Sequence, residues 1–252
     1  MKIGAQMYTV REHTQTAKDF ENTIKKLAAI GYDCVQVSGI GPIPAREVAD
    51  ICKASNMEII ITHTNPDRVK DETNTVIDEH RIMGASYIGI GGMPGCYTRN
   101  TEGVSQFIAD FTPVVEKIHA CGMMFMYHNH AYEFEKYGQK LMIQHLIDEL
   151  PLAGFTIDTY WVQAGGADPC AWIKALKGRV DVLHIKDMAW ANEQQLMAEV
   201  MEGNLNWDGI FAASREAGVK YAMVEQDDCY GHDPFDCLKK SLVNVQEFLH
   251  KS

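Results

Sequence analysis

Eight short apolar segments alternate with eight amphipathic segments along this chain, at about 31 residues for each pair. The apolar segments are expected to be buried parallel strands at 2–8, 33–38, 58–62, 87–90, 123–128, 155–158, 180–185 and 221–225. Between them, helices are expected at 17–30, 45–55, 67–83, 104–120, 140–149, 170–176, 208–216 and 234–249. Eight such units predict an α/β fold, a closed (β/α)₈ TIM barrel that occupies residues 1–252 as a single domain.

The alternative fold for this alternation is an open, doubly wound sheet. That fold usually has a glycine-rich turn directly after the first strand, where it binds a nucleotide. In this sequence the first strand ends in Gln6-Met7-Tyr8-Thr9, which contains no glycine. The sequence therefore favours the barrel, and the site is expected at the C-terminal ends of its strands.

Four successive strands end in residues that bind metals. His128 ends the fifth strand, Asp158 the sixth and Glu225 the eighth, and His184 lies near the end of the seventh. In a closed barrel these strand ends are neighbours, so the four side chains are expected to face one point. Two imidazoles and two carboxylates suit one divalent ion of the Mn²⁺, Zn²⁺, Co²⁺ or Fe²⁺ type, with Mg²⁺ less favoured.

Each of these residues also has a simpler interpretation. A single histidine or aspartate at a strand end is more often a hydrogen-bonding partner than a metal ligand, and the metal interpretation depends on all four occurring together. Lys186 could form only a surface ion pair with Asp187. Lys186 nevertheless shares the inward parity of His184, so it could act as an acid or stabilise an enolate. His130 shares the parity of His128 and is a candidate acid/base.

Further residues are candidate substrate contacts. Gln6 and His63 end the first and third strands, Trp161 and Trp190 lie just beyond the sixth and seventh, and Glu133 follows the histidine-rich segment. Aromatic rings at a barrel mouth can stack on the C–H faces of a sugar, although core packing is the simpler explanation for a tryptophan.

Composition restricts the partners. A net charge of -11 argues against a nucleic-acid partner, because phosphate binding requires a basic surface. No apolar run is long enough to span a membrane, and the N-terminus has no secretory signal pattern. The seven cysteines are scattered and odd in number, which fits free thiols. We expect a cytoplasmic protein; the sequence is compatible with a homo-oligomer and does not specify one.

The strand-end motifs resemble the sugar phosphate isomerase/epimerase family of the xylose isomerase-like TIM-barrel superfamily, which also contains endonuclease IV. The resemblance runs along essentially the whole chain and is carried by the segments Gln6-Met7-Tyr8-Thr9-Val10-Arg11, Tyr127-His128-Asn129-His130 with Glu133-Phe134, Asp158-Thr159, His184-Ile185-Lys186-Asp187 and Glu225. It implies a metal-dependent enzyme that acts on a small carbohydrate.

Two positions depart from the pattern of that family. Epimerases such as tagatose 3-epimerase bind the metal through Glu, Asp, His and Glu, and the two glutamates exchange a proton across the substrate. Here the first glutamate position carries His128. Those epimerases also have a histidine three residues after the strand-six aspartate, where this chain has Trp161.

The resemblance therefore implies a metal-dependent isomerase or epimerase that acts on a keto sugar through an enediolate or enolate, with Glu225 as base and Lys186 or His130 returning the proton. The alternative is a lyase, a dehydratase or a keto-glycoside-cleaving enzyme on the same scaffold. A DNA-repair enzyme like endonuclease IV is less favoured because of the acidic charge, and a non-catalytic sugar-binding barrel is a third alternative. The sequence leaves open the exact sugar, its phosphorylation and the metal.

Overall fold

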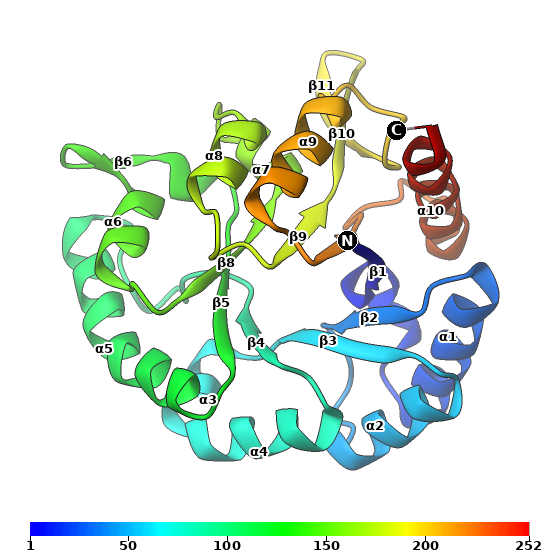
Figure 1. Ribbon diagram of the computed structural model, residues 1–252, viewed down its shortest axis with the longest axis horizontal. Coiled ribbons are helices and arrows are strands. Elements are labelled where there is room, and N and C mark those ends of the chain that lie inside the picture. Colours follow the sequence, from blue (N-terminus) through cyan, green and yellow to red (C-terminus); the bar gives the residue numbers. More distant parts are fainter. Residues whose placement is uncertain (252) are drawn as a thin grey trace.

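Eight parallel strands close into a barrel in the computed structural model of the protein, which describes residues 1–251 (Figure 1). The strands follow one another around the barrel in chain order, and the first closes the ring by pairing with both the second and the last. The barrel strands are β1 (Lys2–Gln6), β2 (Cys34–Val37), β3 (Glu58–His63), β4 (Tyr87–Ile90), β5 (Met124–His128), β8 (Gly154–Asp158), β9 (Val182–Ile185) and β12 (Tyr221–Val224). The predicted TIM barrel is confirmed.

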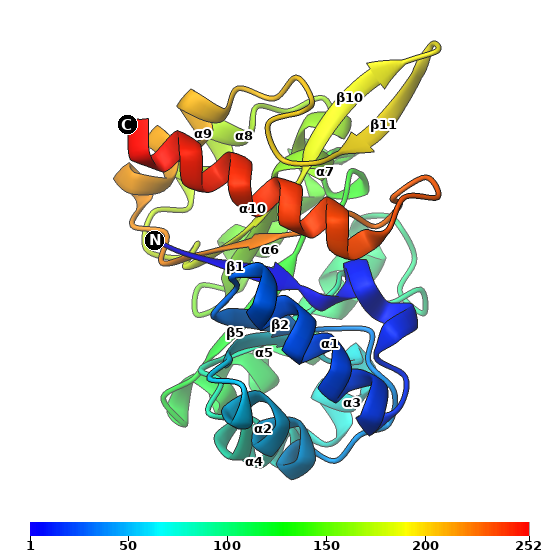
Figure 2. The same ribbon diagram turned by 90° about the vertical axis from the view of Figure 1, so that its right-hand side faces the viewer.

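The helices lie around the outside of the barrel (Figures 1 and 2). Helix α1 shows why the sequence folds in this way: Thr16 caps its first turn, the apolar side chains of Phe20, Ile24 and Leu27 face the barrel, and Gly31 ends it at a φ of 117°. The helices are α1 (Ala17–Ile30), α2 (Ala45–Ala54), α3 (Pro66–Asp71), α4 (Thr73–Met83), α5 (Thr101–Ala120), α6 (Met142–Glu149), α7 (Thr159–Ala164), α8 (Pro169–Ala175), α9 (Trp207–Ala217) and α10 (Pro234–Lys251).

The inside of the barrel is a packed core rather than a channel. Cys34, Ile61, Tyr87, Met126 and Met223 are buried there in one cluster. The hydroxyl of Tyr87 donates to Asp181 Oδ2 at 2.8 Å, near the N-terminal ends of the strands. Side chains therefore fill the barrel, and the rim at the C-terminal ends of the strands remains as the place for a site.

Several element boundaries differ from the prediction, among them those of the first strand, the third helix and the seventh strand. β1 ends at Gln6 because its side-chain Oε1 accepts from Tyr8 N at 2.8 Å and starts the 3-10 helix η1 (Met7–His13). The helix predicted over 67–83 is divided into α3 and α4 at Glu72, whose backbone is not helical. The seventh barrel strand begins at Val182 rather than Val180.

Two antiparallel hairpins lie outside the barrel and were not predicted. The first pairs β6 (Lys136–Tyr137) with β7 (Lys140–Leu141), and the second pairs β10 (Asp187–Ala191) with β11 (Gln194–Ala198). The turn of the second hairpin has positive φ at both Asn192 and Glu193, the geometry of a type I′ turn. This hairpin projects beyond the barrel on the side toward which β1 points (Figure 2).

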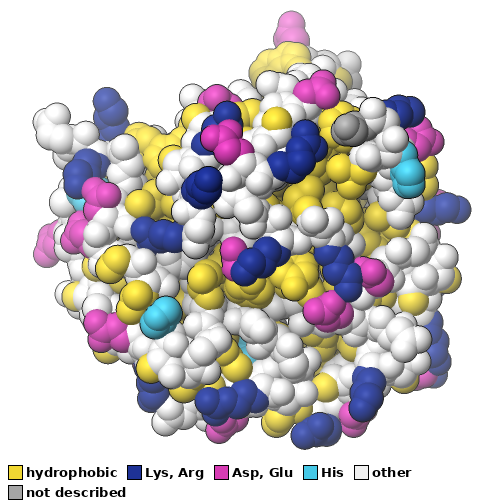
Figure 3. Space-filling view, in the orientation of Figure 1, with side chains coloured by type: hydrophobic (Ala, Val, Ile, Leu, Met, Phe, Trp, Pro, Cys, Tyr) yellow, Lys and Arg dark blue, Asp and Glu magenta, His cyan; other side chains and the backbone are white. Residues whose placement is uncertain are grey.

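The surface carries charges of both signs. On the face shown in Figure 3, basic and acidic side chains lie next to one another. Ion pairs of this kind include Lys2 with Glu58 at 2.7 Å and Lys220 with Asp181 at 2.8 Å. Within residues 1–251, no helix combines the length and the apolar character needed to cross a membrane. The absence of a nucleic-acid partner stays a prediction.

Candidate metal centre

The structure brings together the four residues that the sequence proposed as metal ligands. His128 ends β5, Asp158 ends β8, His184 lies in β9 and Glu225 follows β12, and these four strands are neighbours in the barrel. One donor atom from each residue lies within 4.8 Å of those of the others, and all four residues are buried.

The donor atoms of this cluster fit a divalent metal ion. His184 Nδ1 and Glu225 Oε2 lie 2.9 Å apart, yet neither atom makes a hydrogen bond with any described residue. His128 Nε2 and Asp158 Oδ2 are 3.4 Å apart. Buried polar atoms without partners are rare in proteins, and a cation bound between these two atoms would satisfy both of them. Two nitrogen and two oxygen donors suit Mn²⁺, Zn²⁺, Co²⁺ or Fe²⁺.

Side-chain amides hold several of these residues from outside the cluster. Gln6 Nε2 donates to Glu225 Oε1 at 2.7 Å, and Gln36 Oε1 accepts from His184 Nε2 at 2.8 Å. Asn129 Oδ1 accepts from the backbone N–H of Asp158 at 3.0 Å. Such outer contacts fix the orientation and the tautomer of metal-binding side chains.

Lys186 adds a buried positive charge beside the cluster. Only 1% of its side chain is exposed, and its Nζ lies 3.8 Å from Asp158 Oδ2, 3.7 Å from Glu225 Oε2 and 2.5 Å from Asp227 Oδ2. Burial opposes the charged form of Lys186, but the carboxylates of Glu225, Asp158 and Asp227 outweigh it and raise its pKa. Lys186 is therefore a cation at neutral pH.

The same charges set the state of the acidic groups. Burial favours the neutral forms of Asp158 and Glu225, but Lys186 and the histidines outweigh it and lower both pKa values. Burial and the nearby Glu225 raise the pKa of Asp227 to about 6. Burial disfavours a charged His184, but Glu225 and Asp158 outweigh it and raise its pKa to about 9. The cluster thus attracts a positive charge between its carboxylates.

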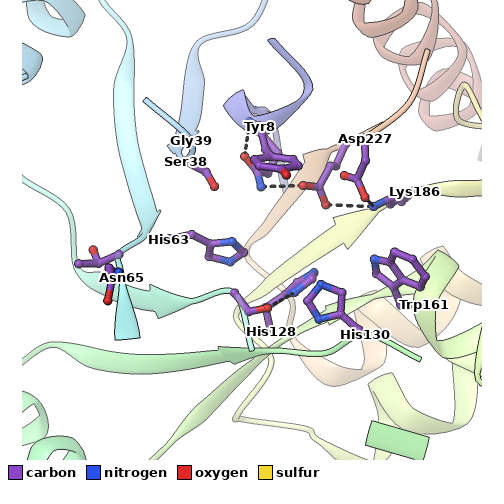
Figure 4. Close-up of a pocket in the computed structure, with 14 residues that line it drawn as sticks. Tyr8, Ser38, Gly39, His63, Asn65, His128, His130, Trp161, Lys186 and Asp227 are labelled. Carbon is purple, nitrogen blue, oxygen red and sulfur yellow. Dashed lines mark hydrogen bonds and ion pairs between the residues drawn. The ribbon is translucent and has the colours of Figure 1, made fainter. Parts of the chain in front are cut away.

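A cavity of about 360 Å³ opens above the cluster (Figure 4). The predicted site residues that line it are Gln6, His63, His128, His130, Trp161, Lys186 and Glu225. Trp161 lies beside His130, with ring centroids 5.4 Å apart. The sequence prediction therefore identified about half of the pocket wall.

Two histidines that line this pocket have a buried nitrogen without a partner among the described residues. Burial and the nearby His128 lower the pKa of His130 to about 3, and burial with the same neighbour lowers that of His63 well below its ordinary value. Both imidazoles are therefore neutral at pH 7. The unpartnered atoms are His130 Nδ1 and His63 Nε2.

Two predicted substrate contacts do not reach the pocket. Glu133 is fully buried, where Oε1 accepts from the Tyr127 hydroxyl at 2.8 Å and Oε2 from the backbone N–H of His130 at 2.7 Å. Glu133 therefore supports the segment that carries His130. Trp190 lies on hairpin strand β10 with 64% of its surface exposed and does not line the cavity.

The sequence prediction missed several residues of the pocket and its supports. Asp227 lines the cavity and contacts Lys186, and Gln36 holds His184. The parity that selected Lys186 after His184 would also select Asp227, two residues after Glu225. Tyr8 in η1, and Ser38 and Asn65 just after β2 and β3, also line the cavity and were not predicted as site residues.

A parallel barrel with a buried cluster of His, Asp, His and Glu at its C-terminal rim defines a TIM-barrel protein with a candidate metal centre at the catalytic face of the fold. The chain belongs to the xylose isomerase-like TIM barrel family, whose family model matches residues 24–237. No curated protein sequence is similar enough to match this chain.

Solved structures share this fold at low sequence identity. A sugar phosphate isomerase/epimerase from Parabacteroides distasonis ATCC 8503 is 21% identical, with a TM-score of 0.82 over 97% of this chain and 93% of that chain. A D-allulose 3-epimerase from Methylomonas sp. is 16% identical, with a TM-score of 0.72 over 98% of this chain and 97% of that chain. The probable 3-DHS dehydratase AsbF from Bacillus anthracis is 14% identical, with a TM-score of 0.73 over 98% of this chain and 99% of that chain.

Proposed function

We propose that this protein is a divalent-metal-dependent isomerase or epimerase that enolises a keto sugar. The observation that carries the proposal is the buried cluster of His128, Asp158, His184 and Glu225, in which two facing donor atoms have no hydrogen-bond partner within residues 1–251. Membership of the xylose isomerase-like family and neighbours named as sugar isomerases or epimerases support it.

The four clustered residues would hold the ion, which when bound would polarise a substrate carbonyl as a Lewis acid. Glu225 is ionised at neutral pH because Lys186 and His184 lower its pKa, so it can accept the proton from the carbon next to the carbonyl. Gln6 Nε2 donates to Glu225 Oε1 at 2.7 Å and so fixes the orientation of this carboxylate.

Lys186 and His130 complete the proposed proton transfers. The Lys186 ammonium lies 3.7 Å from Glu225 Oε2, so it can stabilise the negative charge that develops on the enolate oxygen. His130 is a neutral imidazole that lines the pocket, and it can relay a proton to or from the substrate. Asp227, whose pKa is about 6, is a further proton-exchanging group that contacts Lys186.

Elimination by the same residues is the second candidate. His128 replaces a carboxylate that would otherwise face Glu225, and the probable 3-DHS dehydratase shares the fold as closely as the D-allulose epimerase does, with TM-scores of 0.73 and 0.72. Both reactions begin with removal of a proton next to a carbonyl, so both require Glu225.

The experiment is α-proton exchange with solvent. The Mn²⁺-loaded protein is incubated in D₂O with ketohexoses, inososes and 3-keto-glucosides, and deuterium incorporation next to the carbonyl is followed by NMR. Glu225→Gln keeps the shape and one oxygen donor but removes the base, so exchange should fall by about a hundredfold or more. The control is Glu116→Gln on the exposed surface of α5, which should exchange as the parent does. Absence of exchange in the parent on every sugar would contradict the proposal.

A further inference from the structure

We infer that the substrate of this pocket is an uncharged keto sugar rather than a sugar phosphate. This inference rests on the proposed function and narrows its substrate class. The inference follows from two observations. The lysine and arginine side chains around the pocket already contact other groups of the protein, and the backbone N–H groups of one loop already donate to a carboxylate.

Lys186 is the only lysine or arginine among the described residues that line the pocket. Its ammonium already contacts the carboxylates of Asp158, Glu225 and Asp227, at 3.8, 3.7 and 2.5 Å. A divalent ion in the cluster together with Lys186 would only balance these three negative charges. The loaded pocket would thus have no net positive charge to offset a phosphate dianion, and burying an uncompensated ion is costly.

Two arginines near the mouth of the pocket already make hydrogen bonds or ion pairs within the protein. The Arg11 guanidinium donates to the backbone oxygens of Tyr8 at 2.9 Å and Asp227 at 3.1 Å. Arg68 lines a groove next to the pocket, but it forms a two-pronged ion pair with Glu79 at 2.9 and 2.6 Å. Recruiting either arginine to a phosphate would break these contacts first.

Arg99 lies at the end of the loop after β4, and its guanidinium also makes contacts within the protein. Its Nη2 donates to the backbone oxygen of Met93 at 2.9 Å, and its guanidinium lies 3.8 Å from the centroid of the Tyr132 ring. It therefore supports the ring that stacks on His130, with 11° between the two planes.

The loop that often binds phosphate in this fold is already occupied by a carboxylate. TIM barrels frequently bind phosphate through backbone N–H groups of the loops after strands seven and eight. In this protein the loop after the seventh barrel strand directs its N–H groups at the buried Asp187. The donors are Met188 N at 2.7 Å, Met201 N at 2.7 Å, Gly203 N at 3.1 Å and Leu205 N at 3.3 Å.

The loop after the eighth strand repels an anion instead of binding it. Asp227 lines the pocket and Asp228 follows it. A phosphate ester in the pocket would therefore face a like charge at Asp227. The remaining polar groups of the wall, including Ser38, Thr64 and Asn65, are neutral and suit the hydroxyl groups of a sugar.

The test compares sugars that differ only by a phosphate ester. D-fructose with D-fructose 6-phosphate, and D-ribulose with D-ribulose 5-phosphate, are titrated into Mn²⁺-loaded protein by calorimetry, and α-proton exchange is measured on the same compounds. We expect each ester to bind no more tightly than its parent sugar, and this includes the case in which neither compound binds detectably. Where α-proton exchange occurs, we expect the ester to exchange at least about tenfold more slowly than the parent sugar. An ester that binds about tenfold more tightly than its parent, or exchanges faster, would overturn the inference.

A variant without the Asp227 charge tests whether this carboxylate disfavours the phosphate ester. Asp227→Asn should raise the affinity for the ester relative to its parent sugar, whereas Asp228→Asn removes the same charge from an exposed neighbouring side chain and should change that ratio less. The ratio within one variant cancels a general loss of site integrity. The two proposals fail on different results. Proton exchange on phosphate esters alone would contradict the inference of an uncharged substrate and support enolisation. Absence of exchange on every sugar, with no ester binding more tightly than its parent sugar, would contradict only enolisation.

Discussion

His184 Nε2 donates a hydrogen bond of 2.8 Å to the Oε1 atom of Gln36, across the inside of the barrel between β9 and β2. Because a carbonyl oxygen can only accept, this contact keeps a proton on Nε2, so Nδ1 is the nitrogen that can bind a metal ion once it has lost its own proton. Nδ1 is the atom that faces Glu225 Oε2 at 2.9 Å. Gln36 therefore selects the nitrogen with which His184 can bind a metal ion.

Replacing Gln36 should weaken metal binding without touching a ligand. In Gln36→Leu the buried His184 Nε2–H loses its acceptor, and we expect the affinity for Mn²⁺ to fall about 10–100-fold. Gln36→Glu keeps an acceptor oxygen and should bind at least as tightly as the parent. Titration followed by electron paramagnetic resonance of free Mn²⁺ measures both. Parent-like affinity in Gln36→Leu would show that this contact does not control the site.

Gln36 also illustrates how far the sequence could be interpreted. The four candidate ligands could be predicted because each follows an apolar strand, and parallel strands in a barrel bring their ends together. A glutamine between Val35 and Val37 carries no comparable signal, because its role depends on which side chain lies opposite it across the barrel. That relationship joins residues 148 positions apart and is set by the closure of the barrel.

The two tryptophans proposed as sugar platforms should behave differently. Trp161 lines the cavity beside His130, whereas Trp190 is 64% exposed on the β10–β11 hairpin. Trp161→Ala should raise KM about tenfold, which corresponds to ~1.4 kcal/mol of lost binding. Trp190→Ala should leave KM and kcat unchanged. Steady-state kinetics on the best substrate checks both, and a raised KM in Trp190→Ala would mean that the hairpin reaches the substrate.

The different positions of these two residues show why the sequence did not separate them. Both follow a barrel strand by a few residues, so strand parity treats them alike. The chain after β8 turns at once into α7 and keeps Trp161 at the rim, whereas the chain after β9 continues into a hairpin and carries Trp190 away from it. The type I′ turn that makes the hairpin rests on Asn192 and Glu193, and only the asparagine is typical of such a turn.

Stability should depend on pH through His80, a buried residue of α4. Its Nδ1–H donates to the backbone oxygen of Val76 at 2.7 Å, and its Nε2 lies 2.8 Å from the hydroxyl of Thr62. Burial lowers the pKa of His80 from 6.5, so the folded protein holds it neutral. As the pH falls below about 6.5 the unfolded chain takes up this proton and the folded chain does not, so folding free energy is lost with acidification.

His80→Gln should therefore be less stable than the parent at pH 8 by ~1–3 kcal/mol, because a buried hydrogen-bonded group is lost. The difference from the parent should narrow as the pH is lowered from about 7 to 5, since the variant has no histidine to protonate at this position. Urea denaturation at each pH measures this, with His119→Gln on the exposed face of α5 as the control. A difference that stays constant with pH would show that His80 does not contribute to the acid sensitivity.

The last prediction concerns Lys186, whose Nζ lies 3.7 Å from Oε2 of the proposed base Glu225. An ammonium group so close to the base can stabilise an enolate oxygen, and Lys186→Met should then abolish α-proton exchange and product formation together. If Lys186 instead protonates a leaving group, the variant should keep the exchange and lose only elimination, which would favour the lyase. Lys186→Met leaves three carboxylates without their cation and could therefore impair folding. Lys186→Arg is the companion variant because it keeps the positive charge. Partial recovery of exchange in Lys186→Arg, with thermal stability like that of the parent, would show that the role of Lys186 is electrostatic and that the loss in Lys186→Met is not a loss of folding.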